Sequence, residues 1–304
     1  MSSERHAGHA PPERESWAAA PGQVARWIGV ELDLQAPRTW HGPTWAMLGG
    51  MVSSGNVPLT LRSVVLLAVA WLVSEPLLGS LLHLAMQIAR LRHADRTREV
   101  VEVRWTIPYA RPHSPAQRAM DRLAARVGRL LGEWRALQGA GAQWLLLALI
   151  TATLSAVAGG YVPVLVLVAL AVTVAVALRR PARGQAREAL AAGQFMVAWL
   201  VGRSTFVDAD YYAVLAGLGL AVVWYAWTRR PPLVPALAAG QLLLAGLLAA
   251  LHAPLLAGLI LLLTVPPLAL LPEGPSSQRT YLAHTQPYLM ASLLAVAWGL
   301  VWPI

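Results

Sequence analysis

A succession of apolar segments, most of them 16–20 residues long, constrains the fold of this chain more than any other feature. They cover residues 41–57, 62–89, 143–158, 161–178, 189–206, 210–228, 233–251, 254–271 and 286–303. A helix needs about 20 residues to cross the ~30 Å hydrocarbon core of a bilayer. Only 13% of the residues are charged, against about a quarter in an average soluble domain. The sequence therefore predicts an all-α fold, a polytopic integral membrane helical bundle with about nine transmembrane helices.

The arginines predict how this bundle is oriented. The chain has no lysine, so all 24 basic residues are arginine. If the chain begins in the cytoplasm and changes side at each apolar segment, every arginine except Arg62 and Arg203 lies on the cytoplasmic side or in its loops. Cytoplasmic loops are enriched in basic residues. We therefore expect an N-in, C-out, multi-pass protein of the bacterial cytoplasmic (inner) membrane.

Two missing residue types exclude several kinds of chemistry. Without cysteine, the chain cannot form disulfides, thiolate metal sites or iron–sulfur clusters. Without lysine, it cannot form a Schiff base or a phosphate-binding P-loop. The arginines flank apolar segments rather than forming a basic soluble face, so the high pI of about 10.9 does not indicate nucleic-acid binding. We expect no metal, no cofactor and no nucleic-acid partner.

Two polar regions complete the predicted domain organisation. Residues 1–40 are expected to form a cytoplasmic polar tail, in which 22–34 form an interfacial helix. Residues 41–304 form the transmembrane bundle, and this includes a long cytoplasmic loop at 90–142. Within the loop, residues 99–107 alternate in polarity like a short strand.

The second half of this loop has the pattern of a basic amphipathic helix. It begins at Ser114-Pro115, a typical helix start, and its apolar residues then recur at helical spacing. The residues expected to meet lipid or a partner are Arg118, Arg122, Arg126, Arg129 and Trp134. We expect the helix to lie in the cytoplasmic interface, where arginines meet anionic headgroups of the lipid bilayer. The alternatives are a lid over a cavity or a docking surface for a partner in a membrane complex.

Glu75 is the most informative polar residue, because a charge inside a span costs at least ~2.5–3.5 kcal/mol on insertion scales. Pro76 follows it and should kink the helix. His83 and Gln87 recur on the same helical face, and the first span enters from the same side. The candidate cytoplasm-facing cavity thus comprises His41, Trp45, Glu75, His83 and Gln87. The alternative is a neutral Glu75 that holds two helices together by a hydrogen bond.

Several other residues are expected to have structural roles. Arg203 lies close enough to the end of its span to pair with Asp208, Asp210 or headgroups. Tryptophans near span ends are usually anchors in the aromatic belt of the membrane interface. In this chain those residues are Trp45, Trp144, Trp227 and Trp302.

Two short motifs resemble those of the YwiC-like family of bacterial membrane proteins. They are His41-Gly42-Pro43-Thr44-Trp45 in the first segment and Glu75-Pro76-Leu77 in the second. The resemblance implies a membrane architecture but no reaction.

The topology also resembles that of UbiA-like prenyltransferases, as does Pro37-Arg38-Thr39-Trp40. Those enzymes bind a prenyl diphosphate through Mg²⁺ on two Asp-rich motifs. The corresponding positions here read Ser74-Glu75-Pro76-Leu77-Leu78 and Thr228-Arg229-Arg230-Pro231-Pro232, without such a motif. Metal-dependent prenyl transfer is therefore not expected.

Three functions agree with these features. The one we favour is a non-catalytic accessory or assembly subunit, or a binder of a lipid-soluble molecule in the cytoplasm-facing cavity. The second is a UbiA-like enzyme with an altered site that acts on an isoprenoid or quinone-like substrate. The third is a small-solute or proton transporter that uses Glu75.

Overall fold

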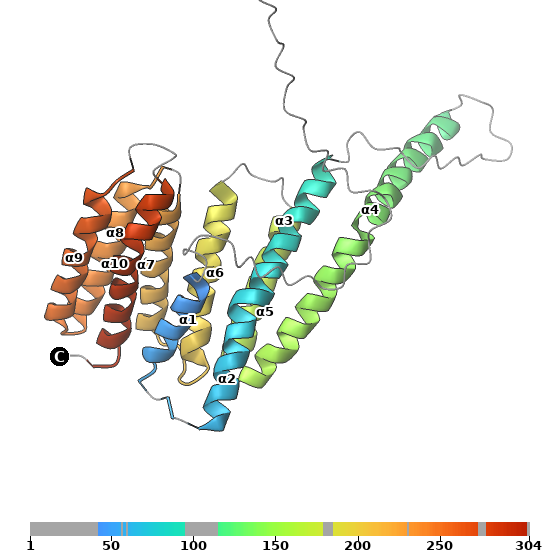
Figure 1. Cartoon of the computed structure of the whole chain (residues 1–304). Helices are drawn as coiled ribbons and strands as arrows, with labels where there is room; N and C mark the ends of the chain where they lie inside the picture. The colour runs from blue at the N-terminus through green and yellow to red at the C-terminus, as the bar shows by residue number, and fades with distance from the viewer. Residues whose placement is uncertain are drawn as a thin grey trace, which may run out of the picture.

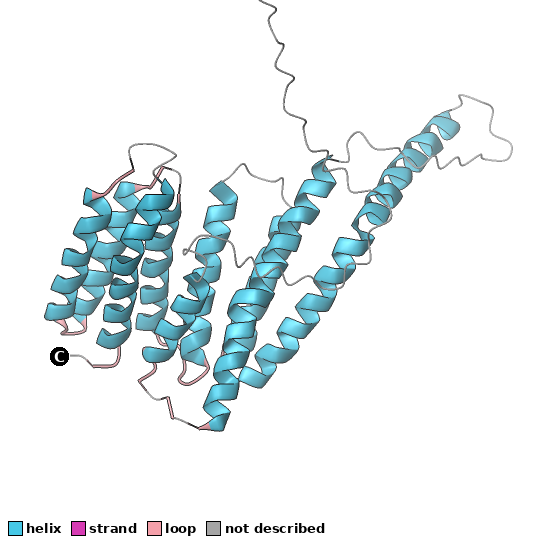
Figure 2. Ribbon diagram, viewed as in Figure 1, coloured by secondary structure: helices cyan, strands magenta, loops and turns pink. Residues whose placement is uncertain are grey.

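The computed structural model describes residues 42–55, 57–58, 60–94, 115–178, 185–229, 231–272 and 278–302. Their regular secondary structure is entirely helical (Figure 2), which confirms the all-α prediction for this part of the chain. The polar tail with its predicted interfacial helix, His41 and the alternating residues 99–107 lie outside the described residues.

Ten α-helices and one π-helix occur in the described residues. They are α1 (Gly42–Val52), α2 (Leu61–Leu72), the π-helix η2 (Val73–Leu77), α3 (Leu78–Ala94), α4 (Pro115–Ala158), α5 (Val162–Leu178), α6 (Gln185–Ser204), α7 (Tyr211–Thr228), α8 (Val234–Ala250), α9 (Pro254–Ala269) and α10 (Gln278–Gly299). Helices α2, η2 and α3 follow one another without a break, and successive rods run in alternating directions (Figure 1). We call the end where α3 stops the upper end of the bundle, and the end where α2 begins the lower end.

Within the described residues, three stretches of helix are long and apolar enough to cross a membrane. They are Leu61–Ala89, Gly139–Ala158 and Tyr211–Thr228, and α5, α8 and α9 are shorter apolar helices. Only 39%, 17% and 56% of the most apolar window of each long stretch is buried inside the protein. Apolar side chains that face outward need a hydrocarbon environment, so the chain is a helical membrane protein.

Helix α4 differs from its prediction. It runs for 44 residues without interruption, so the amphipathic helix that was expected to lie in the cytoplasmic interface continues directly into the span at 143–158. The polarity of the sequence changes near Gly139, but no proline follows Pro115 within the helix. Glycine costs a helix only about 1 kcal/mol, against about 3 for proline. We call residues 115–138 the α4 arm; in Figure 1 its first turns extend past the other helices at the upper end.

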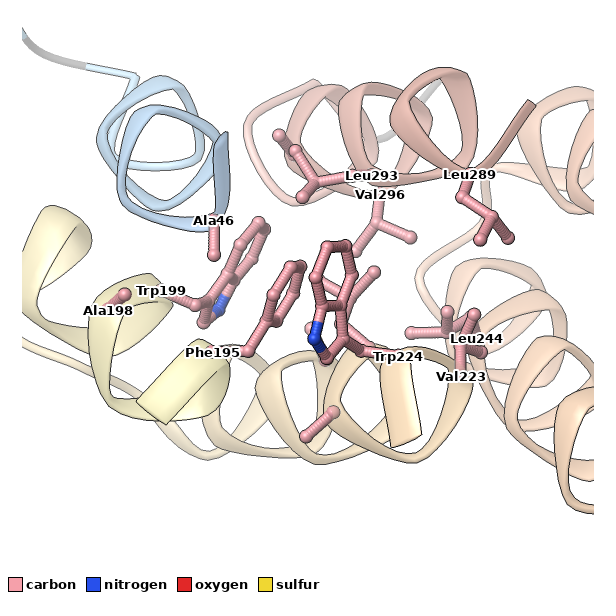
Figure 3. Packing of buried hydrophobic residues seen from close by; sticks show 14 of the residues in the cluster. Ala46, Phe195, Ala198, Trp199, Val223, Trp224, Leu244, Leu289, Leu293 and Val296 are labelled. Carbon is pink, nitrogen blue, oxygen red and sulfur yellow. The ribbon is translucent and has the colours of Figure 1, made fainter. Parts of the chain in front are cut away.

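The core is built around aromatic side chains of α6 and α7. Phe195 and Trp224 stack with their ring centroids 4.7 Å apart, and Trp199 lies beside them below α1 and α10 (Figure 3). The indole N–H of Trp199 donates to the Ala213 carbonyl at 3.0 Å. That of Trp227 donates to Thr285 Oγ1 at 2.7 Å. Because Trp227 is fully buried, its assignment to the aromatic belt is wrong: a side-chain partner on α10 satisfies its N–H inside the bundle.

Helices α1 and α6 approach each other so closely that their backbones touch. A Cβ atom at Gly50 would lie 2.0 Å from the Trp199 carbonyl oxygen. A Cβ atom at Gly202 would lie 2.0 Å from the Met47 carbonyl oxygen. We call this contact the α1–α6 seam. The seam fixes the position of α1 along the axis of α6. This position determines which residues of α2 and η2 the first turn of α1 contacts.

Candidate functional site

Glu75 lies at the centre of η2, the π-helical turn that joins α2 to α3. Pro76 follows it inside the turn and has no backbone N–H to donate, so the regular helical pattern cannot continue through this position. Single π-turns inside α-helices are frequent at functional sites. Glu75 is about 20 Å from the start of α2, at ~1.5 Å per residue. Its side chain is half-buried.

The carboxylate of Glu75 faces the beginning of α1. It accepts a hydrogen bond from the backbone N–H of Thr44, in the first turn of that helix. The first N–H groups of a helix have no acceptor within the helix and carry its positive dipole end. The indole N–H of Trp71 also donates to Thr44 Oγ1, at 3.0 Å. A carboxylate and an indole of the second rod thus hold the start of α1.

Gln194 connects the same turn to α6. Its Nε2 donates to the Ser74 carbonyl at 3.0 Å and to the Glu75 carbonyl at 3.4 Å. The Glu75 carbonyl also accepts the Leu78 N–H, so the amide on the neighbouring helix adds a second donor at this irregular turn. We call Glu75, Thr44, Trp71 and Gln194 the Glu75 junction. Gln194 and Trp71 were not among the predicted site residues; a lone amide within an apolar segment was the signal for Gln194.

The other described residues of the predicted cavity, Trp45, His83 and Gln87, do not join this junction. His83 Nε2 and Gln87 Nε2 lie 2.8 Å apart, and both side chains are exposed on α3. The buried face of that helix is formed instead by Leu81 and Ala85, each of which is fully buried. Trp45 follows Thr44, but its side chain is 39% exposed. The described residues of the predicted cavity thus lie on different faces.

The predicted basic residues all belong to the α4 arm. The side chains of Arg118 and Arg122 are exposed. Arg126, Arg129 and Trp134 lie in the same helix, and their side chains are outside the described part of the structure. Because α4 is one continuous helix, Arg118 and Arg122 lie on the same helix as the apolar stretch that follows them.

A second polar group holds the other end of α1. Arg203 is 6% exposed, and its Nη1 donates to the carbonyl of Ser53, just after α1. Its Nη2 pairs with Asp210 Oδ2 at 2.8 Å, which confirms the predicted pairing with Asp210. Asp210 also caps α7, since its Oδ1 accepts the Ala213 N–H at 2.7 Å. A cation at the end of α1 and a carboxylate at its start both match the helix dipole.

A cleft of about 920 Å³ opens at the lower end of the bundle. It lies between the first turns of α2, the α4–α5 turn and the segment that joins α6 to α7. Its lining comprises Leu61, Arg62, Val65, Leu66, Val157, Ala158, Gly159, Gly160, Ser204, Thr205, Phe206, Val207 and Asp208. It lies at the end opposite to His83 and Gln87, so it is not the predicted cavity.

Neither region has the ligands of a metal centre. Within the described residues, no group of three or more His, Cys, Asp or Glu side chains could hold a metal ion. The Glu75 junction supplies a single carboxylate, an indole and an amide, and these groups can bind polar atoms or exchange one proton. The chain matches no known protein-family model, no curated protein and no solved structure.

Proposed function

We propose that the protein is a non-catalytic accessory or assembly subunit of the bacterial inner membrane, which docks a partner on the α4 arm. In this proposal the upper end lies in the cytoplasm, the eight longer helical rods of the described residues each cross the bilayer, and the 11-residue helix α1 enters it only in part. The alternating direction of the helices (Figure 1) supports this topology, as does the sequence pattern that assigns every arginine except Arg62 and Arg203 to the side on which the chain begins.

The length of α4 is the observation that carries the docking role. The apolar stretch of this helix begins at Gly139. Arg122 precedes that residue by 17 positions, or about 25 Å along the axis at ~1.5 Å per residue. The headgroup layer on each side of the core is only about 5–8 Å thick. An arm that leaves the membrane along its own axis carries Arg118 and Arg122 past the headgroups. This favours an acidic protein surface over lipid as their partner.

Charge reversal on the arm tests this role. The full-length protein carrying Arg118→Glu and Arg122→Glu should lose a stoichiometric partner that the wild type retains, because complementary charges become repulsive. Native mass spectrometry after extraction in mild detergent reports the partner directly. The matched control is Arg118→Lys with Arg122→Lys, which keeps both charges and should keep the partner. Equal recovery with both variants, or no stoichiometric partner on the wild type, would exclude docking through these residues.

A second candidate function is small-solute or proton transport through Glu75, which the Glu75 junction favours. Helix α1 has 11 residues, so it extends about 16 Å at ~1.5 Å per residue, roughly half of a ~30 Å core. Its first turn meets a carboxylate in an interrupted helix. Transporters place their binding sites at such discontinuous helices near the middle of the bilayer.

Glu75→Gln separates transport from a structural role. The amide oxygen can still accept the Thr44 N–H, but the side chain can no longer carry a proton. The flux is measured in liposomes loaded with a pH-sensitive dye. If Glu75 transports protons, the wild type should show a proton flux, and Glu75→Gln should reduce it to the level of empty liposomes. The melting temperature of the variant should equal that of the wild type. Equal flux from wild type and variant would rule out proton transport by Glu75.

A further inference from the structure

The lower-end cleft has the properties of a ligand site that is distinct from the α4 arm and from the Glu75 junction. We propose that it binds an anionic lipid-like amphiphile, with the charged head at Arg62 and the hydrocarbon chain along the apolar wall. The proposal requires neither a docking partner nor a transported solute, so it is independent of the function proposed above.

Arg62 supplies the positive charge. It occupies the first turn of α2, is exposed and lines the cleft. The charge pattern of the sequence assigns every arginine to the upper end except two, Arg62 and Arg203. Arg203 is held by Ser53 and Asp210. For Arg62 the structure shows no ion pair within the described residues. An arginine without an ion pair in the described part of the chain is a natural partner for an anion.

Two helices add to this positive potential. Both α2 and α5 begin beside the cleft, at Leu61 and Val162. Before α5, Gly159 and Gly160 adopt φ values of +75° and +54°, a region that favours glycine. A Cβ atom at Gly160 would lie 2.8 Å from the Ser204 carbonyl oxygen, so only glycine lets the turn approach α6 here. The positive starts of helices favour anions. Here they offset the negative charge of the Asp208 carboxylate, which also lines the cleft.

Ser204 supplies a polar group without an evident structural task. It lines the cleft and is 4% exposed, and its Oγ has no hydrogen-bond partner among the described residues. The neighbouring Thr205 shows the usual arrangement, since its hydroxyl donates to the Val201 carbonyl at 2.7 Å. A buried hydroxyl without a partner is unfavourable. An oxygen of a bound headgroup would satisfy it.

The remaining lining identifies the ligand as an amphiphile rather than a soluble anion. Leu61, Val65 and Val157 line the cleft and have 81%, 49% and 58% of their surface exposed. Such residues on a membrane protein contact hydrocarbon, so the cleft is open toward the bilayer. A soluble phosphate would leave this wall unused, and an uncharged lipid would leave Arg62 unpaired.

Native mass spectrometry of the full-length protein in mild detergent tests the proposal. The protein is titrated with phosphatidylglycerol, with phosphatidylcholine of the same chains, and with glycerol phosphate. We expect the wild type to retain phosphatidylglycerol roughly fivefold better than phosphatidylcholine. This is the ratio of affinities that one partly exposed charge contact provides. Arg62→Gln should abolish the preference. Arg229→Gln, an arginine at the upper end, is the control and should preserve it.

Ser204→Ala adds a readout that a purely structural role would not give. The variant should bind less phosphatidylglycerol while its melting temperature stays equal to that of the wild type or rises, because the hydroxyl has no partner to lose. Equal retention of the two lipids by the wild type, or a preference that survives Arg62→Gln, would overturn the proposal. Glycerol phosphate bound as well as the lipid would also overturn it, since the site would then take a soluble anion.

Discussion

Alanine at Gly202 should lower the melting temperature of the protein sharply, although it adds a single methyl group. The new Cβ would lie 2.0 Å from the Met47 carbonyl oxygen and 2.8 Å from its carbonyl carbon. Both atoms belong to the backbone of α1, so no side-chain rotation can relieve the clash. Helix α1 must then move away from α6. Overpacking of this kind costs about 1–3 kcal/mol, and occasionally more.

Gly193→Ala is the matched control on the same helix. A Cβ atom there would have nothing within 4 Å. Alanine favours a helix over glycine by about 1 kcal/mol, so this variant should melt at or above the wild-type temperature. Intrinsic tryptophan fluorescence in one detergent measures both variants. If Gly202→Ala and Gly193→Ala melt at the same temperature, the α1–α6 seam is not as close as described.

Removal of the Arg203 guanidinium should have the other large effect on stability. The side chain of Arg203 is 7% exposed, whereas that of Asp210 is 49% exposed. Arg203→Met leaves the Ser53 carbonyl and one oxygen of Asp210 without their donor. Loss of one partner of a buried ion pair costs about 3–5 kcal/mol. The exposure of Asp210 places the expected cost near the lower value, about 3 kcal/mol.

Asp210→Asn completes a double-mutant cycle for this pair. Asparagine still caps α7, because its side-chain oxygen can accept the Ala213 N–H, so the variant removes little except the charge opposite Arg203. Each single variant should destabilise the protein. The double variant should be more stable than the sum of the two losses predicts, because the ion pair can be lost only once. If the losses of stability measured by thermal or urea unfolding are strictly additive, the ion pair does not contribute to the stability of the protein.

The Glu75 junction shows how far a sequence can predict a site. A carboxylate and a proline inside an apolar segment identified Glu75 and Pro76 from local pattern alone. The hydrogen bond from Thr44 depends on how far α1 is displaced along α2, and the glycines of the α1–α6 seam decide that. His83 and Gln87 were placed beside Glu75 because they share a helical face. Packing turned Leu81 and Ala85 inward instead.

The sequence by itself determined the features that depend on neighbouring residues. These are the helical character of the described chain and its membrane environment, since hydropathy and backbone preference act over one or two turns. Only the tertiary structure decided which polar groups meet. The lower-end cleft combines residues near positions 62, 158 and 205, and Arg203 pairs with Ser53 from 150 residues away. Such contacts form when whole helices pack, and no local pattern encodes the distance between two helices.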